Sequence, residues 1–124
     1  MKLTPDDKGY ITKNFKDSEF RKSSKRPMDY DFMILLQALR TEFGEPLIIN
    51  SGVRTDKENK AAGGSSRSQH KYGRAVDIST KGWSSEKKHR LLKLAFALGF
   101  TGIAQGETFI HLDLRPGRSS TWTY

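Results

Sequence analysis

Two histidines and one aspartate have the residue types and spacing needed to bind a transition metal in this 124-residue chain: His70, Asp77 and His111. Two imidazoles and one carboxylate can hold a zinc ion while leaving a fourth coordination position free for water. That free position distinguishes catalytic zinc sites from closed structural ones. The chain has three histidines and no cysteine, so no other residues could form a nitrogen- or sulfur-rich site.

The spacing of these residues supports their treatment as a set. His70 precedes a turn signal, Tyr72-Gly73, and Asp77 follows on a predicted strand, so the bend can bring the two side chains together. His111 lies on a different predicted strand, and a bound ion would therefore connect distant parts of the chain. Each histidine taken alone also fits an ordinary hydrogen-bonded or surface residue, and spacing does not decide between the two interpretations.

Carboxylates flank the last of these residues. Side chains alternate along a strand, so Glu107, His111 and Asp113 are expected on one face of it. Metal-assisted hydrolysis needs a base near the activated water, and a carboxylate can serve. Both acidic residues are therefore candidate bases.

Composition indicates a single domain over residues 1–124. Hydrophobic residues make up 35% of the chain and charged residues 29%, which suits a small fold with a modest core. The longest apolar run, Phe32 to Leu36, is too short to span a bilayer, so no membrane insertion is expected. The first residues lack the apolar stretch of a signal peptide, which predicts synthesis in the cytoplasm. The lack of cysteine fits a reducing compartment.

The chain is strongly basic, with a formal charge of +8 and a pI near 9.8. Such a charge is compatible with nucleic acids, anionic membrane surfaces or polyanionic cell walls, and equally with a solvated basic surface. Basic residues are scattered and interleaved with acidic ones, and no nucleic-acid-binding motif is present. We therefore expect no specific nucleic-acid partner. Nothing suggests an interface helix or a coiled coil, which favours a monomer.

The pattern of apolar residues predicts an α+β fold in which helices and short strands mix without a βαβ repeat. Residues 1–28 read as an irregular arm with one helical turn near Asp17 to Arg21. The elements expected after it are a helix at 29–43, a buried strand at 46–50, a short helix at 55–62, a loop at 63–66, a strand at 74–79, a helix from Ser84 or Ser85 to Leu98, and a last clear strand at 108–114. A tail with Trp122 and Tyr124 follows.

Several of these motifs together resemble the zinc D-Ala-D-Ala carboxypeptidase family, most closely its branch of small, phage-associated murein peptidases, and more distantly the hedgehog-type signalling fold. The similarity covers about residues 14 to 118. The segments that carry it are Ser51-Gly-Val-Arg54, Gly63-Gly64, the spaced pattern Ser68, His70, Gly73, Ala75 and Asp77, and Phe109-Ile-His111-Leu-Asp113.

The resemblance implies a small antiparallel sheet with flanking helices and one zinc ion bound by His70, Asp77 and His111. Arg54 matches the arginine that binds or polarises the substrate near the scissile carbonyl, and a permanent cation there can stabilise an oxyanion. A structural salt bridge is the alternative role for Arg54. Ser68 is a candidate hydrogen-bond partner of the first ligand, and both it and Tyr72 are candidate substrate-binding residues.

The sequence departs from many family members at the position of the general base. Where those proteins carry a Glu or Asp three residues before the last zinc histidine, or a His two before it, this chain has Thr108 and Phe109. Asp113 fits the His-x-Asp pattern of the branch, and Glu107 is the nearest upstream carboxylate. Asp113 could instead orient a zinc ligand. The base therefore stays open between the two.

The expected function is zinc-dependent hydrolysis of a peptidoglycan stem-peptide bond, of D-Ala-D-Ala carboxypeptidase or endopeptidase type. A phage or prophage lytic or virion enzyme, made in the host cytoplasm and acting on the cell wall after release or from the virion, fits the missing signal peptide. The alternative is a zinc-bound, non-catalytic cell-wall-binding module. The sequence does not name the bond that is cut.

Overall fold

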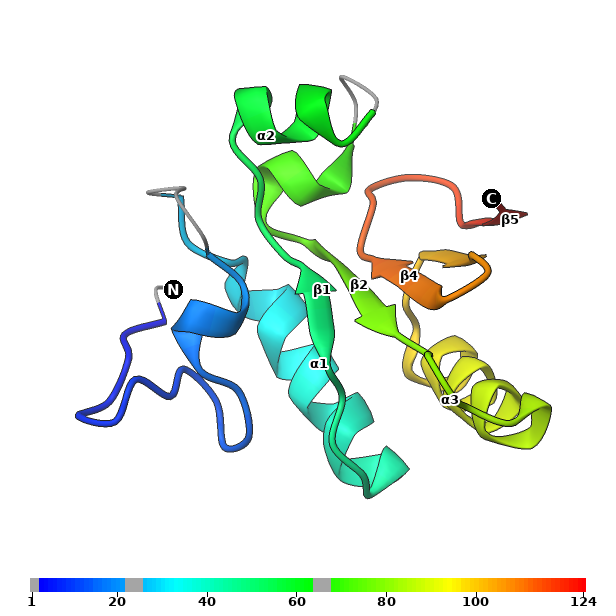
Figure 1. The fold of residues 1–124 in the computed structure, drawn as a ribbon. Coiled ribbons are helices and arrows are strands. Elements are labelled where there is room, and N and C mark those ends of the chain that lie inside the picture. Colours follow the sequence, from blue (N-terminus) through cyan, green and yellow to red (C-terminus); the bar gives the residue numbers. More distant parts are fainter. Residues whose placement is uncertain (1–2, 22–25, 64–67) are drawn as a thin grey trace.

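The computed structural model describes residues 3–21, 26–63 and 68–124 (Figure 1). Apart from Gly63, the loop expected at 63–66 lies outside these ranges. No helix in the described parts of the chain is long and apolar enough to cross a membrane.

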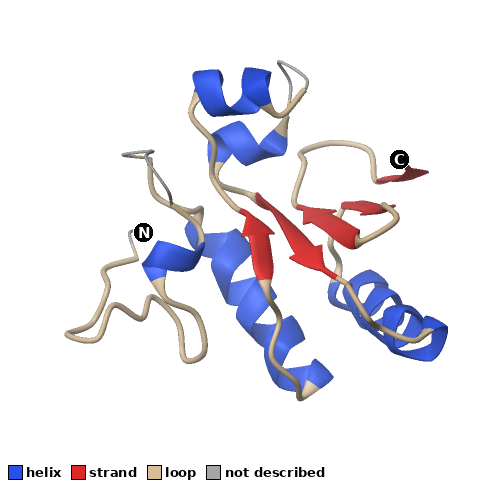
Figure 2. Cartoon of the chain, viewed as in Figure 1, coloured by secondary structure: helices blue, strands red, loops and turns tan. Residues whose placement is uncertain are grey.

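The chain folds as an α+β structure in which one five-stranded sheet carries helices, as predicted (Figure 2). The strands follow the order β1-β2-β4-β3-β5. The elements are the 3-10 helix η1 (Asp17–Glu19), α1 (Tyr30–Phe43), β1 (Ile49–Ser51), α2 (Asp56–Ala61), the 3-10 helix η2 (Gln69–Tyr72), β2 (Ala75–Ser79), α3 (Ser85–Leu98), β3 (Gly102–Gln105), β4 (Phe109–Asp113) and β5 (Ser120–Thr123).

Helix α1 begins and ends as its sequence predicts. The Asp29 side chain accepts a hydrogen bond from the Phe32 amide at the start, and Gly44 takes a left-handed conformation after Phe43. Helix α3 follows the same rule, with Ser84 as the N-cap and Gly99 as the left-handed C-cap. The capping residues explain why the sequence alone located both helices to within a residue.

The hydrophobic core lies between these two helices and one face of the sheet. Strand alternation directs Val76 and Ile78 of β2, with Ile110 and Leu112 of β4, toward the apolar side, and all four are buried. The intervening residues, among them Asp77 and His111, point to the opposite face. One face of the sheet therefore makes the core, and the other is free to carry polar side chains.

The central strands pair antiparallel, and their register sets residues on that second face opposite each other. Asp77 of β2 pairs with His111 of β4, and Ala75 pairs with Asp113. A shift of one residue would turn all of these side chains to the helix side. The apolar side chains of both strands thus fix the register that brings the polar ones together.

The strands differ from the predictions in three respects. The segment expected as a buried strand at 46–50 forms a three-residue edge strand, β1, that starts later, and Ile48 just before it is 69% exposed. Strands β3 and β5 were not predicted, because Gly102–Gln105 is short and Ser120–Thr123 is mostly exposed. Strand β5 also pairs parallel to β3, so the sheet is mixed and not wholly antiparallel.

The N-terminal arm is irregular, as predicted, but it belongs to the core. Within residues 3–21 and 26–28, which the structure describes, its helical turn is η1, and the side chains of Phe15, Phe20 and Met28 are nearly inaccessible to solvent. The rings of Phe15 and Phe20 pack edge to face with centroids 5.5 Å apart. The Phe20 carbonyl also accepts a hydrogen bond from the Val53 amide. The arm therefore supports the segment that leads into Arg54.

We predict that the arm contributes to global stability. Replacing Phe15, which is 1% exposed, by alanine should reduce the free energy of unfolding by about 3–5 kcal/mol, because a buried aromatic ring is lost and a cavity remains. The matched control is Phe96→Ala on α3, where the ring is 55% exposed and the change should stay within about 0.5 kcal/mol. Urea denaturation with a chelator present measures both. Equal effects of the two substitutions would show that the arm is not part of the cooperative core.

Candidate metal centre

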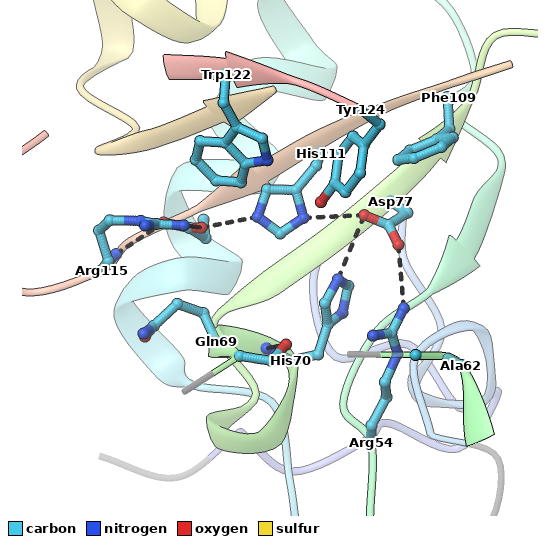
Figure 3. A pocket seen from close by; sticks show the side chains of 13 residues that line it. Arg54, Ala62, Gln69, His70, Asp77, Phe109, His111, Arg115, Trp122 and Tyr124 are labelled. Carbon is cyan, nitrogen blue, oxygen red and sulfur yellow. Dashed lines mark hydrogen bonds and ion pairs between the residues drawn. The ribbon is translucent and has the colours of Figure 1, made fainter. Parts of the chain in front are cut away.

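Three side chains from different elements converge on one point above the polar face of the sheet: His70 from η2, Asp77 from β2 and His111 from β4 (Figure 3). One ligand atom from each lies within 4.8 Å of the other two. Oδ1 of Asp77 is 3.3 Å from Nε2 of His70 and 3.0 Å from Nδ1 of His111. The structure thus brings together the three residues that the sequence singled out.

The donor set and its spacing fit a zinc ion. Zn–N bonds of 2.0–2.1 Å in a tetrahedral site place neighbouring ligand atoms about 3.3 Å apart. The distances from the Asp77 oxygen to the two imidazole nitrogens are close to that value. Both histidines are almost fully buried, whereas Asp77 lies partly open to a pocket. Three ligands and one open side are the arrangement of a catalytic site.

The protein fixes which nitrogen of each imidazole faces the centre. Nδ1 of His70 is 2.8 Å from the carbonyl oxygen of Gly52, which leaves Nε2 to face Asp77. Nε2 of His111 is 2.7 Å from Oδ2 of Asp113, which leaves Nδ1 as the facing atom. Hydrogen bonds of this kind set the tautomer and orientation of metal-binding histidines.

Two glycines make these supporting contacts possible. A Cβ on Gly52 would lie 2.6 Å from the Phe20 carbonyl oxygen, so only glycine lets the Gly52 carbonyl reach His70. A Cβ on Gly102 would lie within 2.3 Å of the Asp113 carboxylate. The carboxylate therefore occupies space that any other residue at 102 would fill.

Asp113 is completely buried and has partners on both oxygens. Besides the bond to His111, it accepts hydrogen bonds from the Arg115 side chain, from Nε at 3.0 Å to Oδ1 and from Nη2 at 2.7 Å to Oδ2. The Arg115 guanidinium also lies over the Trp122 ring, 4.4 Å from its centroid. The imidazole of His111 separates Asp113 from the point where the ligand atoms converge.

Hydrogen bonds among the buried side chains set the protonation states of Asp77, Asp113 and His111. Burial tends to raise the pKa of Asp77, but hydrogen bonds from His111 and His70 outweigh it and hold the pKa far below its ordinary value. Burial likewise opposes ionisation of Asp113, yet hydrogen bonds from His111 and Arg115 lower its pKa to about 2. Burial tends to lower the pKa of His111, whereas its bonds to Asp113 and Asp77 raise it. Both carboxylates are therefore ionised at neutral pH, as cation binding requires.

Arg54 reaches the centre from the segment after β1. Its Nη2 lies 3.3 Å from Oδ2 of Asp77, and its other nitrogens donate to Ser51 and Asn59. These contacts fix the guanidinium plane at the edge of the pocket. Ser68 is the N-cap of η2, and its hydroxyl accepts a hydrogen bond from the His70 amide at 3.3 Å.

The ligand set opens into a pocket of about 490 Å³. Arg54 and residues of η2 line it on one side, and the aromatic residues Phe109, Trp122 and Tyr124 line it on another (Figure 3). Burial raises the pKa of the Tyr124 phenol, and the charge of Asp77 raises it further. The two residues near the C-terminus were not predicted as site residues. Their spacing of two, which places both on one face of an extended segment, was the available signal.

Two candidate residues lie outside this pocket. Glu107 is exposed in the turn between β3 and β4. Tyr72 is 46% exposed and packs its ring against the guanidinium of Arg74, 4.9 Å from the ring centroid. The structure therefore gathers His70, Asp77, His111, Asp113, Arg54 and Ser68 around the pocket, and leaves these two at its periphery.

We predict that Asp113→Asn weakens zinc binding by about tenfold to a hundredfold, because His111 loses its ionised partner. Competition with a chromophoric chelator measures the affinity. Glu107→Gln, which neutralises an exposed carboxylate outside the pocket, is the control and should leave the affinity unchanged. Unaltered zinc binding in the Asp113 variant would show that this carboxylate does not position the ligand.

Comparison with known proteins agrees with this geometry. The sequence model of the family Peptidase M15 matches residues 11–113, which include every proposed ligand. A search of curated proteins finds no match. The family consists of zinc-dependent peptidases, and the three side chains described above form a group that could bind such a metal. This chain belongs to the Peptidase M15 family of metallopeptidases.

Proposed function

We propose that this protein is a zinc-dependent peptidoglycan peptidase that hydrolyses a stem-peptide bond, as a D-Ala-D-Ala carboxypeptidase or endopeptidase. We further propose that it serves a phage or prophage as a lytic or virion enzyme and acts on the cell wall as a monomer. The observation that carries the activity is the set His70, Asp77 and His111, with one open side that faces a pocket.

A single zinc ion held by these residues would supply Lewis acidity, which activates water for attack on a peptide carbonyl. The chain itself supplies the surroundings. Its two nearly inaccessible imidazoles and the ionised Asp77 would hold the ion in place, while the pocket would receive the substrate peptide. Arg54 is fixed by three hydrogen-bonding partners, so its remaining N–H groups are oriented before substrate arrives.

Arg54 is the proposed cationic group for the scissile carbonyl. An arginine has five N–H donors, and the bonds to Ser51, Asn59 and Asp77 use three of them. The other two can donate to a carbonyl oxygen whose negative charge grows during attack. Ser68 would keep the η2 backbone in position, and Tyr72 would contact only those parts of a substrate that extend beyond the pocket.

We infer that Asp113 positions His111 and does not take the proton of the attacking water. Its carboxylate has no exposed surface, and the His111 ring stands between it and the centre. Glu107 is exposed outside the pocket lining and would act only through a movement of its turn. A zinc ion held here would then supply most of the activation of water, and the oriented donors would stabilise the charge that develops on the carbonyl oxygen.

The basic surface suits the proposed substrate. Peptidoglycan and its associated teichoic polymers carry anionic groups, and a protein of charge +8 would be attracted to them over a range that salt shortens.

A non-catalytic cell-wall-binding module is the second candidate function. The observation that favours it concerns the pocket lining: among the described residues its carboxylates are Asp77 and Asp113, and neither is free to serve as a base. Such a module would still bind zinc and cell walls but would release no fragments.

The experiment that tests the peptidase is mass spectrometry of purified peptidoglycan incubated with the zinc-loaded protein. We expect new fragments whose masses identify one stem-peptide bond, and we expect a chelator to abolish them. Intact peptidoglycan from every wall type tested, with zinc bound and cell-wall binding retained, would instead support the binding module.

Replacing Arg54 should separate substrate stabilisation from metal binding. Arg54→Lys keeps a positive charge but loses the planar fork, so we expect kcat to fall by about a hundredfold to a thousandfold. Zinc affinity, measured by chelator competition, should change much less, because Asp77 keeps both histidines as neighbours. Arg118→Lys, an exposed arginine outside the pocket lining, is the matched control. A loss of zinc binding that accounts for the whole loss of activity would assign Arg54 the structural role alone.

A further inference from the structure

We propose that the phenol of Tyr124 is a catalytic hydrogen-bond donor, which binds the oxygen of the scissile carbonyl as that oxygen becomes negatively charged. This inference rests on the proposed peptidase function. It assigns a substrate-contacting role to a residue beyond the segment that matches the family, residues 11–113.

Tyr124 is held in the pocket by contacts along its backbone and ring. Its amide donates a hydrogen bond to the Gln105 carbonyl of β3 at 3.2 Å. Its ring packs against that of Phe109, with centroids 4.9 Å apart, and lies 6.3 Å from the Trp122 ring. These contacts give a side chain that is 69% exposed a defined orientation.

The hydroxyl of Tyr124 is directed at the centre. In Figure 3 it points toward His111 and Asp77, while Arg54 approaches Asp77 from the other side. The ring centroids of Tyr124 and His111 are 6.5 Å apart. Tyr124, Asp77 and Arg54 all line the same pocket. A substrate carbonyl placed at the open side of the centre would therefore meet Tyr124 on one flank and Arg54 on the other.

Other polar groups of the pocket are less available for this role. Asp113 and Arg115 bond to each other behind His111, whereas Arg54 is the cationic donor on the opposite flank. The residues outside the described ranges contain no aspartate or glutamate. The phenol of Tyr124 is thus a neutral O–H donor on the side of the pocket that Phe109 and Trp122 line.

A phenol in this position can donate but has no need to exchange a proton. It carries its proton at neutral pH, so it can stabilise an oxyanion without any change in its own charge. In the overall hydrolysis the C–N bond breaks, the hydroxyl of water joins the carbonyl carbon, and its proton goes to the amine. Tyr124 ends the reaction as it began, which separates this role from that of a general base.

Tyr124→Phe tests the proposal because it removes only the hydroxyl and keeps the ring that packs on Phe109. Tyr10→Phe, which removes a hydroxyl from the N-terminal arm outside the pocket lining, is the matched control. Two quantities are measured on the zinc-loaded proteins. The first is kcat and KM for the bond identified by mass spectrometry. The second is the affinity, by calorimetry, for a phosphinate analogue of that bond, or of D-Ala-D-Ala if no bond is cut.

We expect Tyr124→Phe to lower kcat by about a hundredfold with little change in KM, since the bond forms only in the transition state. Phosphinate affinity should fall about tenfold or more, and zinc affinity should not change. Phosphinate binding equal to that of wild type would overturn the role of Tyr124 while leaving the peptidase intact. If phosphinate affinity depends on Tyr124 but the protein cuts no cell wall, the proposed peptidase activity would be overturned and the proposed role of Tyr124 as a donor would stand. If the wild-type protein does not bind the phosphinate, the proposed donor role of Tyr124 would be overturned.

Discussion

The antiparallel pairing of β2 with β4 is the constraint on which the rest of the structure depends. It sets Asp77 opposite His111 on one face of the sheet, while Val76, Ile78, Ile110 and Leu112 pack against the helices on the other. The apolar residues hold the register, because a slip of one position would exchange the two faces. A core that forms for hydrophobic reasons therefore also brings two metal-ligand candidates within 3.0 Å of each other. The third, His70, is not on the sheet but on the short helix η2. The Gly52 carbonyl holds its imidazole in place.

Each of the two carboxylates beside this strand pair has an arginine partner. Arg54 neutralises one oxygen of Asp77, the other oxygen faces both imidazoles, and Asp113 on the far side of His111 is paired with Arg115. An isolated buried carboxylate would be costly, and leaving one partner of such a pair uncompensated costs about 3–5 kcal/mol. These ion pairs avoid that cost and leave open the side of the centre that faces the pocket. The hydrogen bonds that lower the pKa of both aspartates thus preserve the ligand set in its ionised form.

Local signals in the sequence were sufficient for the helices, and the spaced motifs together singled out the ligand group, but neither revealed the edges of the sheet. Asp29, Gly44, Ser84 and Gly99 mark the helix ends through capping chemistry, which needs no tertiary information. The histidines stood out because the chain has three of them and no cysteine. Strands β3 and β5 are short or exposed, and their pairing depends on segments far away in the sequence, so periodicity could not reveal them. The same limitation concealed Trp122 and Tyr124, whereas the burial of Asp113 behind His111 depends on space left at Gly102.

The parallel pairing of β5 with β3 has consequences for chemistry as well as for shape. It aligns Ala104 with Trp122 and brings the Trp122 ring over the polar face, with its centroid 5.2 Å from that of the His111 ring. Trp122 then covers Arg115, which holds Asp113, and Tyr124 extends the aromatic wall to the open side of the centre. A pocket whose carboxylates are already committed can still stabilise developing charge if neutral and cationic donors are oriented in advance, because preorganised dipoles need no rearrangement during reaction. Tyr124, which directly follows β5, is the proposed neutral donor, and it adds no further buried charge next to two ionised aspartates. The departure from the family pattern at Thr108 and Phe109 is therefore compatible with hydrolysis.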